Sequence, residues 1–384
     1  MPELPPPEPD ASALSARLEA RIRDAIAAAG GRIGFDAFMQ MALYEPGLGY
    51  YVNGLRKFGP GGDFTTAPER SPLFARTLAR QVAQVLRAMP GGEVLEFGPG
   101  SGALAADLLA ELDALGCAPA RYRLLELSAD LQQRQRAALA ARVPHLVERV
   151  AWLTQLPDAF SGVAIANEVL DAMPVRRFCV LDGGLAEQYV AVSGDGLALV
   201  QEPPQDGRLA ARVADLDLPV GYMSELNLAA EAWVRSVCER LDTGLLLLID
   251  YGYARAEYYH PQRVTGTLRC HYRQQAHDDA LRWPGLQDIT AHVDFTAIAE
   301  AAHAAGATVA GFTTQAQFLI NCGLPGLLEA IDPASPDYLD LALQARQLLL
   351  PQAMGEAFKV LGLTRGLGNL APLGFAQGDR RHRL

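Results

Sequence analysis

Three glycines at every second position stand between an apolar run and an Ala- and Leu-rich run in VLEFGPGSGALAADLL, residues 94–109. A glycine loop between a strand and a helix lets a ligand approach the backbone closely, and the first helical turn offers free N–H groups. Gly98, Gly100 and Gly102 therefore predict a binding site for a nucleotide-like cofactor. A plain tight turn is the alternative interpretation.

Two classes of cofactor use such a loop. Gly98, Gly100 and Ala103 satisfy the dinucleotide pattern G-x-G-x-x-G/A, so a nicotinamide or flavin nucleotide is one candidate. Glu96 stands two residues before the first glycine, where its charge would repel a pyrophosphate and attract a sulfonium. Unless Glu96 is only a solvated strand end, it favours S-adenosylmethionine, the cationic methyl donor.

The second and third predicted strands add two candidates for binding the cofactor. Glu126 ends the second strand, and an acid at that position commonly accepts hydrogen bonds from the ribose hydroxyls of a nucleoside. Enzymes that use NAD share this device, so Glu126 does not choose between the cofactors. Trp152 ends the third strand, where its ring would flank the adenine or pack under a helix.

Polar side chains follow the fourth predicted strand, and a carboxylate ends the fifth. Asn167, Glu168 and Asp171 lie in ANEVLDAMPV, and Asp250 ends the run GLLLLID. Ligands of α/β sheets bind outside the carboxyl ends of the strands, so we predict that these four residues are catalytic. A helix cap is the alternative role of Asp171.

The chemistry that these acids suit is methyl transfer to a cation. Displacement of a methyl group from a sulfonium needs mainly alignment and electrostatic preorganisation. A guanidinium stays charged and prefers bidentate carboxylates, so Glu168, Asp171 and Asp250 predict an arginine side chain as the acceptor.

Strands and helices that alternate along the chain must position these residues. Continuous apolar runs are typical of buried parallel strands, and their alternation with helical patterns predicts a doubly wound, mostly parallel α/β sheet. Asp-Gly-Gly and Gly-Asp-Gly within 175–206 predict inserted hairpins. The predicted strands are 93–97, 121–126, 147–152, 162–167 and 244–250, and the helices among them are 101–114, 129–142 and 223–241.

The same patterns predict the division of the chain. We expect four parts: a disordered tail at 1–10, a helical region with a cofactor-covering loop at 11–90, a Rossmann-like cofactor domain at 91–262 with a β-rich insertion at about 175–222, and an α+β substrate region at 263–384.

Composition excludes several classes of protein. The net charge of −11 over 384 residues offers no general field for nucleic acid or an anionic membrane. Five scattered cysteines without a C-x-x-C pair predict neither a disulfide framework nor a metal site, and they suit a reducing compartment. No signal or transit pattern opens the chain and no apolar run could span a bilayer, so we expect a cytoplasmic protein without membrane insertion.

Eight blocks, in order between residues 36 and 362, closely resemble the MidA-like family. They are YEPGLGYYVNG, GPGGDFTTAPE, EFGPGSG, NEVLDAMPV, IDYGY, GTLRCHYR, DITAHVDF and MGEAFKVL. Mitochondrial members of that family include the arginine methyltransferase that helps assemble respiratory complex I. The resemblance implies a class I S-adenosylmethionine fold whose glycine loop lines the donor, with Asn167, Glu168 and Asp171 at the active-site rim and Asp250 nearby.

The resemblance also adds weaker candidates. Asp63, Thr65 and Thr66 match a family block and are predicted to fold over the cofactor, although a glycine turn capped by Asp63 is the alternative. His292 is a candidate substrate-site base or a structural hydrogen-bonding residue, and Tyr251 is a candidate substrate contact.

The leading hypothesis is a methyltransferase that uses S-adenosylmethionine and acts on an arginine of a protein, such as a complex I subunit. A catalytically idle assembly factor with the same fold is the second hypothesis, and an NAD(P)-dependent oxidoreductase is the third. The sequence leaves open the acceptor protein, the degree of methylation and the oligomeric state.

Overall fold

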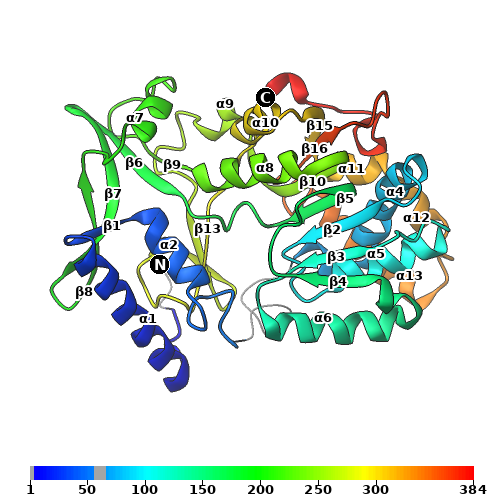
Figure 1. Cartoon of the computed structure of the whole chain (residues 1–384), viewed down its shortest axis with the longest axis horizontal. Helices are drawn as coiled ribbons and strands as arrows, with labels where there is room; N and C mark the ends of the chain where they lie inside the picture. The colour runs from blue at the N-terminus through cyan, green and yellow to red at the C-terminus, as the bar shows by residue number, and fades with distance from the viewer. Residues whose placement is uncertain (1–3, 56–65) are drawn as a thin grey trace. The chain divides into compact units, whose positions relative to one another are not determined.

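The computed structural model describes residues 4–55 and 66–384, and the chain falls into two compact units (Figure 1). The first unit comprises the described part of Met1–Phe64 together with Asp171–Glu231 and Tyr253–Asp294. The second comprises the described part of Thr65–Leu170 together with Ala232–Gly252 and Phe295–Leu384. The expected boundaries at residues 90 and 262 fall inside these units, because the chain passes between the units repeatedly.

A mostly parallel sheet forms the second unit, as the sequence predicts. Its strands lie in the order β15-β16-β10-β5-β2-β3-β4, and every pair from β10 to β4 is parallel. The strand β16 is antiparallel to both of its neighbours. The bounds are β2 Glu93–Phe97, β3 Tyr122–Leu125, β4 Val150–Leu153, β5 Phe160–Asn167, β10 Leu241–Tyr253, β15 Thr308–Thr314 and β16 Phe358–Arg365.

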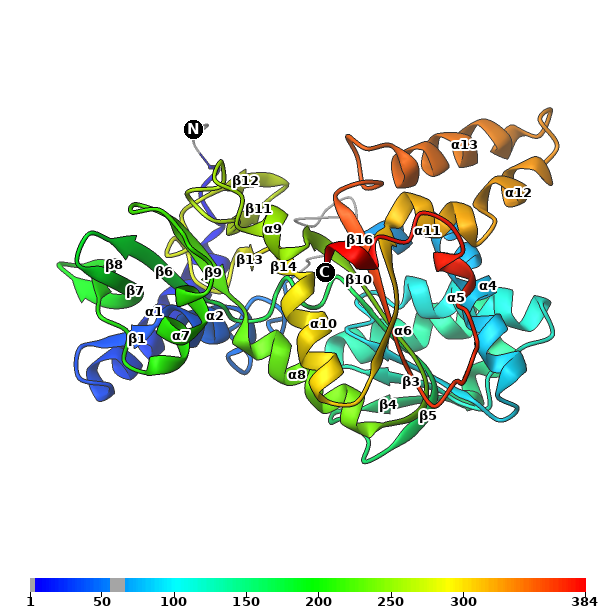
Figure 2. The same cartoon turned by 90° about the horizontal axis from the view of Figure 1, so that it is seen from above.

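Helices lie on both faces of this sheet (Figure 2), and the side chains of its strands alternate between those two faces. Val94, Tyr122 and Val163 belong to the same buried cluster as residues of α4 (Pro72–Ala88) and α5 (Ala103–Ala114). Phe97 stands three positions after Val94, so its side chain lies on the other face of the sheet. Its ring centroid is 4.7 Å from that of Trp233 in α8 (Leu228–Arg240). The other helices of this unit include α3 Ala67–Arg70, α6 Ala129–Arg142, α10 Phe295–Ala304, α11 Gln315–Asn321, α12 Leu324–Glu329 and α13 Pro336–Leu349.

The first unit is built on an antiparallel sheet in the order β1-β7-β6-β9, with β8 paired to β7. The predicted hairpins within 175–206 are confirmed, since Leu181 pairs with Gly184 and Ser193 with Gly196. A three-stranded sheet, β12-β11-β13, completes it. The bounds are α1 Pro9–Ala28, β1 Arg32–Gly34, α2 Phe35–Tyr44, β6 Arg176–Leu181, β7 Gly184–Ser193, β8 Gly196–Glu202, α7 Gly207–Ala214, β9 Met223–Leu226, α9 Arg255–Tyr258, β11 Arg269–Tyr272, β12 Gln275–His277, β13 Asp288–Thr290 and β14 Val293–Asp294.

Several local predictions need correction. The predicted helix 223–241 begins with strand β9, because Met223–Leu226 pairs with β6 and the helix starts only at Leu228. The third strand begins at Val150, since Pro144–Arg149 forms a 3-10 helix. Met354, Phe358 and Leu361 stand at helical spacing in the sequence, but the chain from Phe358 onward forms strand β16 between β10 and β15.

The predicted disordered tail also needs correction over its described part. Leu4 is buried and packs in one small cluster with Tyr272 and Leu286. The first helix begins at Pro9, where proline suits the first helical turn because it lacks an N–H that would need a partner. Burial of one apolar side chain and an early helix start therefore fix this segment.

Candidate active site

The strand order reverses between β2 and β5, which are parallel neighbours in the sheet. The chain runs from β2 to β3 and β4 on one side of this point, and β5 leads to the other side. Ligands of open α/β sheets bind at such a switch point, outside the carboxyl ends of the strands. The glycine loop after β2 and the polar turn after β5 therefore leave the sheet side by side at the expected place.

The glycine loop has a backbone that only glycine adopts without strain. Gly98, Gly100 and Gly102 have φ angles of 57°, 52° and 85°. A Cβ atom on Gly102 would lie 3.0 Å from Gln135 Cα, and one on Gly98 would lie 3.2 Å from Val169 Cγ2. The three glycine positions thus present backbone without side chains just ahead of the N-terminus of α5, and they fit a ligand that is bound through backbone groups.

Glu96 lies within the sheet layer. Its side chain is buried, and the hydroxyl of Tyr122 on the neighbouring strand donates to Glu96 Oε2 at 2.5 Å. Burial raises the pKa of Glu96 to about 7, although the hydrogen bond from Tyr122 acts in the opposite direction. The fixed negative charge that the sequence analysis assigned to Glu96 therefore depends on pH near neutrality.

Glu126 follows β3 and has a fixed carboxylate. The backbone N–H of Ser128 donates to Oε1 at 2.8 Å, and Nε2 of Gln135 donates to Oε2 at 3.1 Å. Each carboxylate oxygen has two lone pairs, so these bonds orient the group while leaving capacity to accept hydroxyl protons. The geometry fits the predicted role in binding a ribose.

Trp152 lies in β4, one residue before the strand ends. Its Nε1 donates to Oε1 of Gln135 at 2.9 Å, and the guanidinium of Arg136 lies 3.7 Å from the ring centroid. The ring also packs against the core cluster of the second unit. Trp152 is therefore held in one orientation at the same edge of the sheet as the glycine loop.

The turn after β5 carries two features typical of functional sites. Among the described residues, Asn167 Oδ1 is buried without a hydrogen-bond partner, while Nδ2 donates to Glu168 Oε1 at 3.2 Å. Glu168 has a φ angle of 54°, which costs a non-glycine residue free energy and persists where its surroundings enforce it. Its backbone N–H donates to the carbonyl of Ile249 at 2.9 Å.

Asp250, one of the four predicted catalytic residues, lies in β10 with its carboxyl group bonded to backbone. Its side chain is fully buried, and Oδ2 accepts the backbone N–H groups of Val169 and Leu170 at 3.2 and 2.9 Å. Oδ1 accepts the N–H of Tyr251 at 2.9 Å. Because both oxygens hold backbone, Asp250 acts on the position of the turn after β5.

Asp171, the last predicted catalytic acid, lies in the first unit, among residues that the sequence analysis did not select as a site. The rings of Tyr44 and Tyr51 stack with centroids 5.5 Å apart, and the Tyr51 hydroxyl donates to Asp288 Oδ1 at 2.8 Å. Burial and then the nearby charges of Asp288 and Asp171 raise the pKa of both tyrosines. The aromatic-rich segment before residue 56 was the available signal, but its pairing with residue 288 is not local.

The weaker candidates have more ordinary surroundings. The His292 ring lies 5.3 Å from that of Tyr253, and its backbone N–H donates to Thr267 Oγ1. Tyr251 packs edge-on against Phe358, with ring centroids 5.3 Å apart.

The predicted cofactor cover is largely beyond the described part of the chain. Asp63 and Thr65 lie outside the described residues, whereas Thr66 immediately precedes α3. The carbonyl of Thr66 accepts the N–H groups of Glu69 and Arg70, both at 3.1 Å. This is the ordinary position of a residue at the start of a helix.

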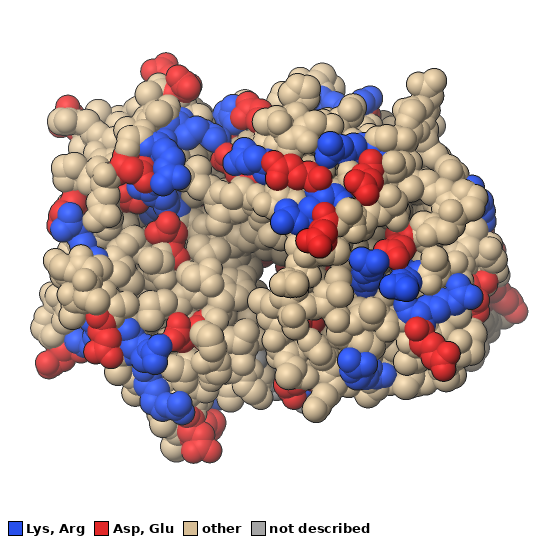
Figure 3. All heavy atoms as spheres, viewed as in Figure 1, with Lys and Arg blue, Asp and Glu red and all other residues tan. Residues whose placement is uncertain are grey.

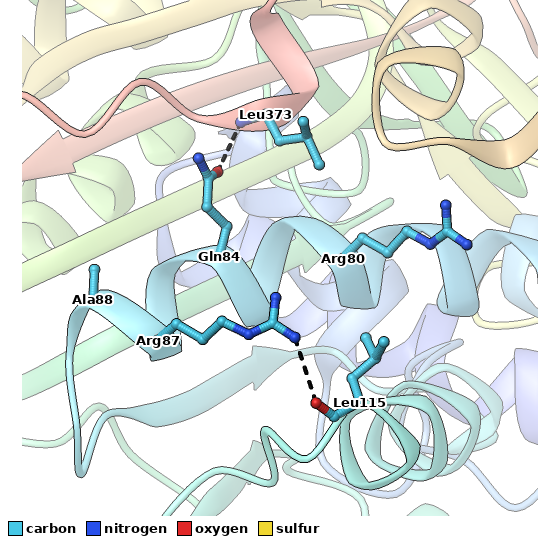
Figure 4. A pocket seen from close by; sticks show the side chains of 6 residues that line it. All are labelled: Arg80, Gln84, Arg87, Ala88, Leu115 and Leu373. Carbon is cyan, nitrogen blue, oxygen red and sulfur yellow. Dashed lines mark hydrogen bonds between the residues drawn. The ribbon is translucent and has the colours of Figure 1, made fainter. Parts of the chain in front are cut away.

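A surface pocket of about 680 Å³ in the second unit lies elsewhere (Figure 4). Arg87 donates to the carbonyl of Leu115, where α5 ends, and Gln84 Oε1 accepts the N–H of Leu373. Because α5 starts at the carboxyl ends of the strands, its final residues mark the opposite edge of the sheet. This pocket is therefore separate from the candidate site.

The described residues limit other kinds of site. No cluster of His, Cys, Asp and Glu in 4–55 and 66–384 could hold a metal ion, and no helix there has the length and apolar character needed to cross a membrane. On the face drawn in Figure 3, the acidic and basic side chains of the described residues are interspersed. This face therefore offers no extended area of one sign to attract a polyanion.

Comparisons with known proteins find relatives that match most of this chain. Residues 77–313 match the family described as "Putative S-adenosyl-L-methionine-dependent methyltransferase". The mitochondrial protein arginine methyltransferase NDUFAF7 of Mus musculus is 31% identical over 87% of this chain and 81% of its own, and the Drosophila melanogaster homolog is 28% identical over 95% and 90%. A Burkholderia thailandensis protein crystallised with S-adenosyl-homocysteine is 48% identical, with a TM-score of 0.97 over 100% of both chains.

Proposed function

The chain belongs to this family of S-adenosyl-L-methionine-dependent methyltransferases, and we propose that it methylates an arginine side chain of a protein. The family membership makes S-adenosylmethionine the cofactor and sets aside the NAD(P)-dependent oxidoreductase. The names of the mitochondrial relatives support arginine as the acceptor. A subunit of respiratory complex I is the protein acceptor that the family resemblance implies.

The donor, when bound, supplies a methyl group on a cationic sulfur. We propose that the backbone of Gly98, Gly100 and Gly102 binds it, since these positions present bare backbone ahead of α5. Glu126 accepts the ribose hydroxyls with a carboxylate that Ser128 already orients. Trp152 and Glu96 complete the proposed donor site, and the segment with Asp63, Thr65 and Thr66 remains its proposed cover.

The observation that carries arginine as the acceptor is the cluster of two stacked tyrosine rings and two buried carboxylates in the first unit. Tyr44 and Tyr51 offer flat π faces, and Asp171 and Asp288 supply negative charge near both rings. A guanidinium is planar, always charged and weakly hydrated, so it suits aromatic and carboxylate partners together. His292 and Tyr251 stay secondary candidates for contacts with the acceptor.

Glu168 and Asn167 are the proposed catalytic residues of the second unit. Glu168 is held in a strained conformation beside the switch point, where its carboxylate can orient an acceptor nitrogen and take the proton that this nitrogen loses on methylation. Asn167 Oδ1 offers a buried acceptor for an N–H group. Asp250 contributes by positioning their turn.

Mass spectrometry tests this function directly. Protein arginine methylation would be compared in cells with the gene, without it, and with the Glu168→Gln variant at equal abundance. We expect one or a few arginine sites to lose methylation in both the deletion and the variant. An idle assembly factor predicts instead that no site changes and that Glu168→Gln behaves as the wild type.

The same experiment addresses location. All five cysteines are free thiols, a state typical of a reducing compartment, and this supports action in the cytoplasm. Methylated sites confined to proteins that mature outside the cytoplasm would contradict that part of the proposal.

A further inference from the structure

The side chain of Gln135 connects three parts of the proposed donor site. It lies in α6, and it is fully buried, with 0% of its surface exposed. Its Nε2 donates to the carbonyl of Gly100 at 2.9 Å and to Glu126 Oε2 at 3.1 Å. Its Oε1 accepts the indole N–H of Trp152 at 2.9 Å.

The partners determine the orientation of this amide. An indole nitrogen only donates and a backbone carbonyl only accepts, so oxygen must face Trp152 and nitrogen must face Gly100. Both amide protons and the oxygen of Gln135 are used. A buried amide needs such partners, but here all of them belong to the segments that follow or form β2, β3 and β4.

The backbone of the same residue lies against the glycine loop. A Cβ atom on Gly102 would lie 3.0 Å from Gln135 Cα and 3.1 Å from its Cγ. Gln135 therefore supports the loop through packing at Gly102 and through a hydrogen bond at Gly100. It also donates to one carboxylate oxygen of Glu126, Oε2, while the backbone N–H of Ser128 donates to the other, Oε1.

We infer that Gln135 is a positioning residue of the donor site. It fixes the glycine loop, Glu126 and Trp152 relative to one another before the donor binds. The inference rests on the proposed donor contacts of Glu126 and the loop. Gln135 acts through these groups and does not itself need to touch the donor. Preorganised groups bind more tightly because less ordering is left to the ligand.

A matched control separates this role from simple support of the fold. Gln81 in α4 is also fully buried, its Nε2 donates to Gln84 Oε1 at 2.9 Å, and its Oε1 accepts the N–H of Gly374 at 2.8 Å. None of these partners belongs to the proposed donor site. Gln81→Met therefore removes a comparable buried amide elsewhere in the same unit.

Calorimetric titration of the full chain with S-adenosylhomocysteine tests the inference, with thermal melts to verify folding. We expect Gln135→Met to raise Kd about tenfold or more, as loss of more than one buried hydrogen bond implies, while Gln81→Met keeps the wild-type Kd. Combined with Glu126→Gln, the effect of Gln135→Met should be less than additive, because the two residues act together.

An unchanged Kd in folded Gln135→Met, an equal rise in Gln81→Met, or full additivity with Glu126→Gln would overturn the inference. Should Gln135→Met not fold, Gln135→Glu replaces it, since it keeps the length and the acceptor for Trp152 but loses both donors. Failure of the wild type to bind S-adenosylhomocysteine would instead overturn the donor site itself. The arginine acceptor is unaffected by any of these outcomes.

Discussion

The fully buried carboxyl group of Asp250 accepts the backbone N–H of Leu170 at 2.9 Å, which ties β10 to the turn after the neighbouring strand β5. The same carboxylate holds the N–H of Val169. This turn contains the strained Glu168, so a conformation that costs free energy is maintained by a carboxyl group one strand away.

Replacing Asp250 by alanine should therefore destabilise the protein as well as impair methyl transfer. The change leaves three backbone N–H groups without their acceptor, and each unsatisfied buried donor costs about 1–3 kcal/mol. We expect a clear loss in the free energy of unfolding, measured in urea. A variant that is inactive but as stable as the wild type would restore Asp250 to the direct catalytic role.

Gly100→Val should abolish binding of S-adenosylhomocysteine. The position has a φ angle of 52°, where a β-branched residue is strained. The valine side chain would also fill the space through which a ligand approaches the backbone of the loop. Gly116 is a matched control, with a φ angle of 65° and no atom within 4 Å of an added Cβ. Gly116→Val should cost stability but keep the calorimetric affinity, and equal loss of binding in both variants would contradict the assignment.

Glu96 should make stability depend on pH. Its pKa is about 7 in the folded protein against 4.5 as the ordinary value, so the folded state retains a proton that the unfolded state loses. The stabilisation that this group contributes is therefore complete below about pH 4.5, decreases as the pH rises to about 7 and then levels off. The total decrease in the free energy of unfolding is about 3 kcal/mol. Glu96→Gln should remove this dependence in urea unfolding between pH 5 and 8. Parallel curves for variant and wild type would contradict it.

Tyr51→Phe should weaken use of the acceptor without affecting the donor. The change keeps the stacked ring but removes the hydrogen bond to Asp288. We expect kcat/KM for a methylated protein or peptide to fall about tenfold, and Kd for S-adenosylhomocysteine to stay unchanged. Tyr222→Phe, which removes a buried hydroxyl that donates to the carbonyl of His260, is the control. Equal kcat/KM values in Tyr51→Phe and the wild type would remove this cluster from the acceptor site.

Glu168→Gly should raise stability while abolishing methyl transfer. Glycine adopts a φ angle of 54° without strain, so the free energy of unfolding should rise by about 1 kcal/mol. Asp217 is exposed with a φ angle of 47°, and Asp217→Gly should give a similar gain with normal activity. Retained turnover in Glu168→Gly, measured with labelled donor, would exclude the proposed catalytic role.

The strand runs, the glycine loop and the polar turn after β5 were predictable because their signals are local. A continuous apolar run followed by glycines specifies a buried strand and a close backbone turn wherever the run lies in the sheet. The same is true of Glu126 and Trp152, which stand at or near the ends of such runs. The sequence therefore indicated the sheet and the edge at which we propose that the donor binds.

Tertiary structure decided the features that need a distant partner. Segment 358–365 becomes a strand because β10 and β15 supply hydrogen bonds on both sides, although Met354, Phe358 and Leu361 stand at helical spacing. Asp250 becomes a positioning group because backbone N–H groups surround it, and Gln135 gains its role from two loops and one strand that meet at α6. Neither a side chain's partners nor its burial follows from its own neighbours in sequence, since both depend on contacts that form only when the chain folds.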